Sequence, residues 1–240
     1  MITVSHLSKV YGQLTAVDDF SFEVGAGEIV GLIGPNGAGK TSTLRCIVGI
    51  QAPSKGTISI NGHKLAEDPV AAKRDLAFMA DEPRLFEYLT VAEHLRLTGR
   101  IYNVRDFDAR YKALIEEMQL TEKENALPAE LSRGMKQKVA IACGLLHEPK
   151  ALLFDEPLTG LDPLGIRHMK RTIVARGQAG GAVLVSSHLL HLVEEICTRV
   201  VIIDRGKKVA DGTIAQISAQ AEAEGSTLEQ LFLKVTGPES

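Results

Sequence analysis

A single glycine-rich stretch, residues 34–41, constrains this chain more than any other part of the sequence. It reads GPNGAGKT and fits the pattern G-x-x-x-x-G-K-S/T. Residues 28–33 before it form an apolar, β-branched run typical of a buried parallel strand, and residues 41–50 after it are typical of a helix that ends near Gly49. The sequence therefore predicts a strand, a phosphate-binding loop and a helix in that order.

This loop has the residue types that bind a nucleoside triphosphate. Its glycines let consecutive backbone N–H groups surround phosphate oxygens, Lys40 can reach the β- and γ-phosphates, and the Thr41 hydroxyl can ligate Mg²⁺. About one chain of this size in a hundred would contain such a string by chance, so we favour a nucleotide site over a turn without a ligand. The residues expected to contact the nucleotide here are Gly34, Pro35, Asn36, Gly37, Ala38, Gly39, Lys40, Thr41 and Ser42.

Composition argues against several other classes of protein. The chain has 240 residues and a formal net charge of −3, so no overall basic field indicates a nucleic-acid partner. Cys46, Cys143 and Cys197 lie far apart without C-x-x-C spacing, which indicates small buried side chains in a reducing compartment and no zinc site or disulfide. The sequence shows no signal peptide and no apolar run of about 18 residues, so we expect any membrane role to come through a partner.

Strand and helix patterns predict an α/β fold with one interruption. Short strand patterns at residues 2–7, 21–24 and 57–60, separated by glycine-containing turns, indicate an N-terminal antiparallel β subdomain. From about residue 83 to residue 147 helical patterns replace the strands, beginning with a capping box at residues 90–93. This segment also carries an apolar helical stripe, which consists of Phe107, Tyr111, Leu114, Ile115 and Met118.

The core resumes after residue 147. Apolar runs separated by helical patterns, typical of a parallel sheet, occur at residues 151–154, 182–185 and 200–203. A second capping box, at residues 226–229, indicates a terminal helix. We therefore predict a P-loop ATPase core with a mostly parallel sheet in a single domain, residues 1–240. Its expected parts are a core at about 1–82 and 148–212, an inserted helical lobe at about 83–147, and a C-terminal helical tail at about 213–240.

Two acids follow the first of these later runs. Asp155 and Glu156 end the apolar segment in the form expected of the Walker B strand of a P-loop ATPase. Asp155 would hold Mg²⁺, directly or through water, while Glu156, where the chain leaves the sheet, could reach an attacking water. Acids without a role are common at strand ends, but beside a phosphate-binding loop we favour the functional interpretation.

A second helix start has the features of a phosphate site. Ser132 is a suitable N-cap, and together with Gly134 and the free N–H groups of the first turn it can bind phosphate. On this string alone a simple helix cap is the better interpretation, but two later motifs favour a functional role. Asp162 lies just beyond the acids, and His188 ends a later strand at the same sheet edge as Lys40, where it can face the γ-phosphate.

These motifs, in this order, resemble the ATP-binding subunit of ABC transporters over nearly the whole chain. Tyr11 matches the aromatic residue that stacks on adenine in that family, and His188 matches the switch histidine. Residues 34–41 match the Walker A loop, Asp155 and Glu156 the Walker B acids, residues 131–135 the LSGGQ signature, and Leu161 and Asp162 the D-loop.

The resemblance implies ATP and Mg²⁺ as cofactors and a pair of subunits that encloses two ATP molecules, each between one Walker A loop and the other signature helix. Ser132, Gly134 and Asp162 would contact ATP, and Glu156 and His188 would be catalytic. The implied partners are integral-membrane permease subunits and a second ATPase subunit, either another copy or a paralogue. Hydrolysis would power transport from the cytoplasmic face of the cell membrane, where the chain would be held by the permease.

Three positions depart from the family pattern. At the junction between core and lobe, where the family usually has glutamine, the sequence has Asp81, whose carboxylate can ligate Mg²⁺ or its water but adds negative charge beside phosphates. Arg133 and Met135 replace a glycine and a glutamine of the signature. This variant and the tail at residues 228–233 resemble ATPases encoded apart from their permeases, many of them bacterial exporters, and so favour export.

The loop after Asp81 is the segment that receives a permease helix in that family. Large apolar side chains follow one another at residues 84–89. We expect Leu85 and Leu89 to pack against the next helix, whereas Phe86 and Tyr88 are the candidates for an exposed aromatic anchor.

Two other function classes fit this sequence less well than transport does. An ABC-type ATPase acting on nucleic acid or ribosomes would carry coiled-coil insertions, a second cassette or a basic stripe, none of which the sequence contains. A P-loop kinase or GTPase would lack the signature helix and His188, and Tyr11 favours adenine over guanine.

Overall fold

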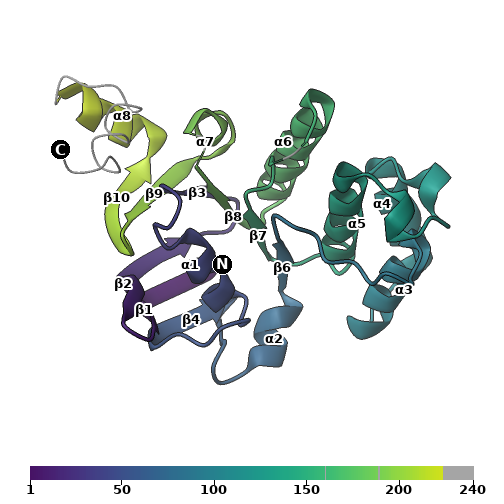
Figure 1. Cartoon of the computed structure of the whole chain (residues 1–240), viewed down its shortest axis with the longest axis horizontal. Helices are drawn as coiled ribbons and strands as arrows, with labels where there is room; N and C mark the ends of the chain where they lie inside the picture. Colours follow the sequence, from purple (N-terminus) through teal and green to yellow (C-terminus); the bar gives the residue numbers. More distant parts are fainter. Residues whose placement is uncertain (160, 189, 224–240) are drawn as a thin grey trace.

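The computed structural model describes residues 1–159, 161–188 and 190–223, and their strands form two sheets. The smaller sheet consists of β1 (Ile2–Tyr11), β2 (Leu14–Val24), β4 (Lys55–Ile60) and β5 (His63–Lys64). It is antiparallel throughout, with strand order β2-β1-β4-β5, and lies at the lower left of Figure 1. The predicted N-terminal antiparallel subdomain is confirmed.

The larger sheet is mostly parallel, as the sequence predicted. It consists of β3 (Ile29–Ile33), β6 (Leu76–Met79), β7 (Ala151–Asp155), β8 (Ala182–Ser187), β9 (Arg199–Asp204) and β10 (Lys207–Thr213). The strand order is β10-β9-β3-β8-β7-β6, and β10 alone among these strands runs antiparallel to its neighbour. Every residue of β3, β7 and β8 is buried, because both faces of the sheet are covered.

The pairing of the central strands brings several loops to one edge. Ile33 pairs with Ser187, and Asp155 pairs with Ser186, in parallel register. The carboxyl ends of β3, β7 and β8 therefore lie side by side, and the segments that follow them leave the sheet at the same edge, where ligands bind in open α/β sheets.

Each face of the larger sheet has its own apolar cluster. Val30 and Leu32 of β3 pack with α1 (Lys40–Ile47) and the antiparallel sheet. Ile29 and Ile33, which point to the opposite face, pack with α6 (Pro163–Gln178), α7 (Leu190–Ile196) and the helices at residues 91–145. Since a fully buried Leu or Ile stabilises the fold by about 1.5–3 kcal/mol, this two-sided burial holds the ends of β3 in place.

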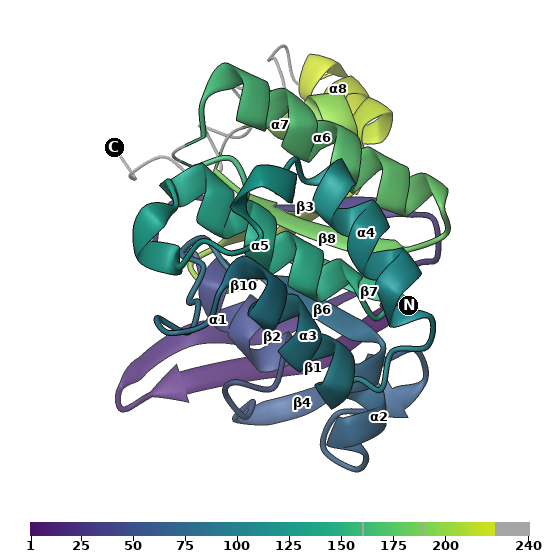
Figure 2. The same cartoon turned by 90° about the vertical axis from the view of Figure 1, so that its right-hand side faces the viewer.

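The segment between β6 and β7 contains helices and no strand. It forms α3 (Val91–Ile101), α4 (Phe107–Glu117), α5 (Arg133–Leu145) and two 3₁₀ turns, Thr121–Lys123 and Pro128–Glu130. These helices lie to one side of the larger sheet, at the right of Figure 1 and nearest the viewer in Figure 2. The predicted capping box is confirmed: the Glu93 N–H donates to the Thr90 hydroxyl, and the Thr90 N–H donates to the Glu93 carboxylate.

Several elements differ from the sequence-based expectation. β1 and β2 are longer than predicted, because His6 and Asp19 adopt left-handed backbone conformations that shift the register and break the alternation of apolar side chains. The short helix α2 (Pro69–Arg74) and the strands β6 and β10 were not predicted, and α8 (Ile214–Ala223) begins the predicted helical tail. The capping box expected at residues 226–229 lies outside the described residues.

Candidate nucleotide-binding and catalytic site

The phosphate-binding loop connects β3 to α1, as predicted. Gly37 has φ of 83° and Gly39 φ of 108°, in the left-handed region that glycine adopts without strain. A Cβ at Gly39 would also collide with the Ala16 carbonyl oxygen. The loop can therefore keep this curvature only with glycine at these two positions.

Lys40 lies almost fully buried beneath this loop. Its Nζ donates to the carbonyl oxygens of Gly34 at 2.7 Å and Pro35 at 3.1 Å. Burial lowers the pKa of Lys40, and the charges of Glu156 and Asp155 oppose that change. The ammonium group thus has acceptors that a phosphate oxygen could replace without moving the side chain far.

Asp155 ends β7 and is 7% exposed. Its Oδ1 accepts a 2.6 Å hydrogen bond from the Ser186 hydroxyl on the neighbouring strand. Burial raises the pKa of Asp155; the Ser186 hydrogen bond and Lys40 oppose this rise, while the charges of Glu156 and Asp81 add to it. A bound cation would favour the ionised form, so this carboxylate suits a metal.

Glu156 and His188 are in direct contact. Glu156 has φ of 47°, and its N–H lies 3.2 Å from the carbonyl oxygen of Ser186, so the carboxylate leaves the sheet toward β8. His188 Nδ1 lies 2.9 Å from Glu156 Oε2, while Lys40 Nζ lies 3.8 Å from Glu156 Oε1. Since an ionised carboxylate only accepts, His188 donates from Nδ1, and the loop lysine, the acid and the histidine form one connected group.

The oxygen atoms at this edge fit Mg²⁺. Mg²⁺ prefers hard oxygen ligands and keeps several waters, so one or two protein groups are enough. Asp155 supplies a buried carboxylate, and Thr41 supplies an exposed hydroxyl in the first turn of α1. These two residues would hold the ion beside the phosphate-binding loop.

The signature segment forms the expected helix start. Ser132 is the N-cap of α5, and its hydroxyl accepts a 3.2 Å hydrogen bond from the Met135 N–H. Gly134, in the first turn, is half-buried. Ser132 and Gly134 come from the helical lobe, whereas the phosphate-binding loop comes from the core.

Asp81 does not stand alone at the junction. It follows β6, and its Oδ1 lies 3.0 Å from Nη2 of Arg133, the first residue of α5. The two positions that depart most in charge from the family pattern are therefore paired with each other. The sequence alone does not pair these two residues, because they are 52 positions apart.

Two further predicted residues, Tyr11 and Asp162, make contacts within their own segments of the chain. Tyr11, at the end of β1, is partly exposed and donates from its hydroxyl to Gln51. Asp162 caps α6 by accepting from the Gly165 N–H at 2.7 Å. Gly160 lies outside the described residues.

Two contributors at this edge were not predicted. Besides Ser186, the side chain of Gln137 on α5 is buried and donates at 2.8 Å to the carbonyl oxygen of Pro157, just after Glu156. Gln137 therefore links the signature helix to the segment that carries the catalytic candidate. A polar residue on the apolar side of a predicted helix was the only signal in the sequence.

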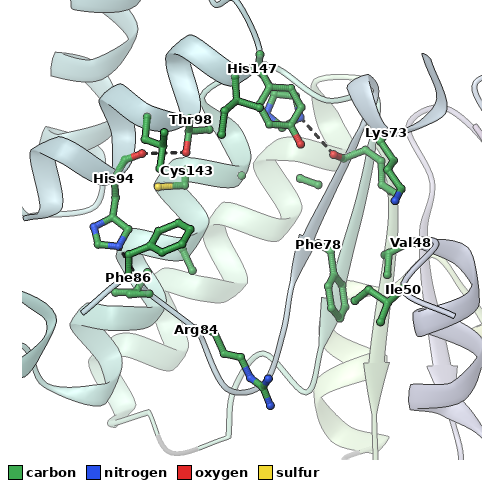
Figure 3. Close-up of a pocket in the computed structure, with 18 residues that line it drawn as sticks. Val48, Ile50, Lys73, Phe78, Arg84, Phe86, His94, Thr98, Cys143 and His147 are labelled. Carbon is green, nitrogen blue, oxygen red and sulfur yellow. Dashed lines mark hydrogen bonds between the residues drawn. The ribbon is translucent and has the colours of Figure 1, made fainter. Parts of the chain in front are cut away.

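A groove of about 430 Å³ separates the helical lobe from the core, away from the phosphate-binding loop. Figure 3 shows Phe86, His94 and Cys143 on one side of it and Val48, Ile50 and Phe78 on the other.

The loop that borders the groove is held by a histidine. His94 is 5% exposed; its Nε2 accepts from the Phe86 N–H at 2.9 Å, and its Nδ1 donates to the Thr90 carbonyl oxygen at 2.8 Å. Phe86 and Tyr88 remain 64% and 87% exposed. Leu85 packs against the apolar core, as expected.

Comparisons with known proteins agree with this arrangement. A family model described as ABC transporter matches residues 17–159. The ABC-type transporter ATP-binding protein EcsA of Bacillus subtilis is 36% identical over 238 residues, covering 98% of this chain and 96% of the relative. The SkfA peptide export ATP-binding protein SkfE of the same organism is 36% identical, covering 92% and 93%. A solved structure titled "Structure of ATP binding subunit of ABC transporter" superposes with a TM-score of 0.92 at 38% identity, covering 98% of this chain and 99% of that chain.

Proposed function

Because the chain belongs to the ABC transporter family and is an ATP-binding, ATP-hydrolysing subunit, we propose that residues 34–42, Asp155, Glu156 and His188 are its ATPase site. The observation that carries this proposal is the connected group at the sheet edge. The Glu156 carboxylate lies 3.8 Å from Lys40 Nζ through one oxygen and 2.9 Å from His188 Nδ1 through the other. No other group in the described residues joins the phosphate-binding loop to an acid and a histidine in this way.

In the proposed mechanism, each residue of this group has a separate task. Lys40 binds phosphate oxygens in place of the loop carbonyls that it contacts now. Glu156 accepts a proton from the attacking water, and His188 holds the Glu156 carboxylate in position from the opposite side. Tyr11 lies partly exposed at the end of β1, and its ring would stack on adenine in place of the Lys9 ammonium, which now lies 5.0 Å from the ring centroid.

Mg²⁺ is the proposed metal, held by Asp155 and Thr41. When bound, it would neutralise negative charge on the phosphates. Ser186 prepares Asp155 for this role, because its hydroxyl occupies one carboxylate oxygen and leaves the other free. Asp81 is a third candidate ligand, although in this structure its carboxylate pairs with Arg133.

We propose that two ATPase subunits close around ATP. The phosphate-binding loop surrounds phosphates from one side only, and the helix start at Ser132, in the helical lobe, offers further N–H donors for the other side. A second subunit, either another copy or a paralogue, would bring its Ser132, Gly134 and Asp162 to the nucleotide. Binding energy from ATP would then hold the pair together.

The proposed partners are integral-membrane permease subunits at the cytoplasmic face of the membrane. In the described part of the chain, no helix is both long and apolar enough to span a bilayer. The groove beside Phe86 and Tyr88 would receive a permease segment. The export named in the SkfE relative supports export as the direction. The net charge of −3 gives no support for a nucleic-acid partner.

We further propose that the chain acts as one domain of two moving parts. The core, about residues 1–82 and 148–212, would carry the phosphate-binding loop, and the helical lobe, about residues 83–147, would carry the signature helix. The helical tail would begin near residue 213, where α8 starts.

One experiment tests the whole proposal. The tagged chain is purified from detergent-solubilised membranes, the accompanying proteins are identified, and the size of the Glu156→Gln variant is measured with and without Mg-ATP. We expect an integral-membrane protein to co-purify and the variant to double in mass only with Mg-ATP. A chain that stays monomeric with ATP and recovers no membrane protein would contradict the transport proposal.

A further inference from the structure

The inference concerns the ion pair between Asp81 and Arg133. Asp81 lies just after β6 at the end of the core, and Arg133 begins α5 in the helical lobe. Their side chains are 45% and 47% exposed and meet at 3.0 Å. This contact links the junction segment directly to the signature helix.

Asp81 also lies close to the sheet edge that carries Lys40, Asp155 and Glu156, which we call the catalytic edge. Met79, the last residue of β6, pairs with Phe154 of β7 in parallel register, so Asp81 and Asp155 follow neighbouring strands at the same edge of the sheet. An acid at this edge also lies near the space where the phosphates would lie, since β3, which leads into the phosphate-binding loop, ends at the same edge as β7. Unpaired, Asp81 would therefore repel a polyphosphate.

We propose that Arg133 is a positioning residue that acts through Asp81: it neutralises this carboxylate and holds it toward the helical lobe, so that a nucleotide polyphosphate can approach the catalytic edge. The inference rests on the proposed ATPase site. The family pattern has no charge at either position. The inference explains why the negative charge of Asp81 is accompanied here by the positive charge of Arg133.

The size of the effect distinguishes this role from a stabilising one. A half-exposed ion pair contributes little to folding, so the melting temperature without nucleotide should change by less than about 4 °C when either partner is neutralised. The affinity for a polyphosphate should change more, because the ligand carries several negative charges.

The test measures ATP binding in EDTA by calorimetry, so that neither metal nor hydrolysis takes part. Four proteins are compared: the unaltered chain, Arg133→Gln, Asp81→Asn, and the double variant. Arg133→Gln should weaken ATP binding at least about threefold, the lower range of coupling between contacting charges. In the Asp81→Asn background the same change should have clearly less effect. Asp81→Asn alone should bind ATP as tightly as the unaltered chain or more tightly.

Controls separate this inference from the proposed function. Arg133→Lys keeps the charge and should keep most of the affinity, and high salt should reduce the effect of Arg133→Gln. An unaltered chain that does not bind ATP would overturn the ATPase site itself. Normal binding with an equal effect of Arg133→Gln in both backgrounds would overturn only the inference, because Arg133 would then act without Asp81. A null effect of Arg133→Gln, or weaker binding by Asp81→Asn, would overturn it as well.

Discussion

The catalytic edge and the groove between the helical lobe and the core differ in the chemistry and burial of their side chains. At the catalytic edge, Lys40 and Asp155 are buried; Lys40 donates to backbone carbonyls of the phosphate-binding loop, and Asp155 accepts from the Ser186 hydroxyl. At the groove, Phe86 is exposed, and Tyr88 is exposed on the same loop, which His94 holds by accepting from the Phe86 N–H. The charged groups of the first region find their partners within one chain, whereas the second region leaves apolar surface uncovered.

This difference shows how one chain can separate chemistry from docking. Buried charges need fixed partners, so the catalytic edge forms at the ends of parallel strands, where the backbone varies least. Exposed aromatic side chains can be rearranged at little cost until a partner covers them. Variants in the two regions should therefore fail in different assays.

The largest effect is expected from Glu156→Gln at the catalytic edge. Losing a general base lowers a rate by about 10²–10⁴-fold, while the amide keeps the shape of the side chain and so ATP binding. Phosphate release and an ATP-dependent melting shift, measured on the same sample, check both parts. Glu116→Gln on the exposed side of α4 serves as a control and should hydrolyse ATP normally. A Glu156→Gln variant with the normal rate would move the base to another residue, His188 first.

A smaller loss is expected from Lys40→Ala. Binding to the native state adds about 2.7 kcal/mol of stability at one hundred times Kd, and removal of the ammonium should abolish most of this gain. The melting temperature with and without Mg-ATP measures it, and Lys112→Ala on the exposed surface is the matched control. An undiminished ATP-dependent shift in Lys40→Ala would remove the phosphate-binding loop from the proposed site.

Substitutions at the groove should weaken permease association and leave ATP binding unchanged. Phe86→Ala with Tyr88→Ala should weaken association with the permease by about 2 kcal/mol or more, roughly thirtyfold, and leave ATP binding by the isolated chain unchanged. Quantitative co-purification measures the first effect and calorimetry the second. Val209→Ala, partly exposed on β10, is the control. Normal association would show that docking occurs elsewhere, and a loss of ATP binding would erase the contrast between the two regions.

The smallest effect is expected at His94. His94→Leu leaves the Phe86 N–H without its acceptor, which should cost about 1–3 kcal/mol in stability and reduce permease association through misplacement of Phe86. Urea unfolding and co-purification measure these losses. ATP binding should not change. His94→Gln, whose amide oxygen can accept from the same N–H, should recover part of both losses; an equal loss in Gln and Leu variants would mean that ring packing, and not the hydrogen bond, holds the loop.

Much of the fold could be predicted because the signals were local. Alternating patterns, capping boxes and the glycine loop each occupy a few consecutive residues, and the structure has β3, α1, α3 and β7 close to where those signals place them. The signals failed where the chain departs from regular alternation, as at the irregular β1–β2 pairing near His6.

What the sequence by itself determined is the identity and order of the candidate site residues, since each motif places its own residues on a strand end or a helix start. Only the tertiary structure decided which of these groups meet. Ser186 meets Asp155, and Arg133 meets Asp81, because neighbouring parallel strands and the packing of α5 against β6 bring them together across 31 and 52 residues. A local pattern contains no information about such pairs, as they depend on strand order and helix packing, which the whole apolar core sets at once.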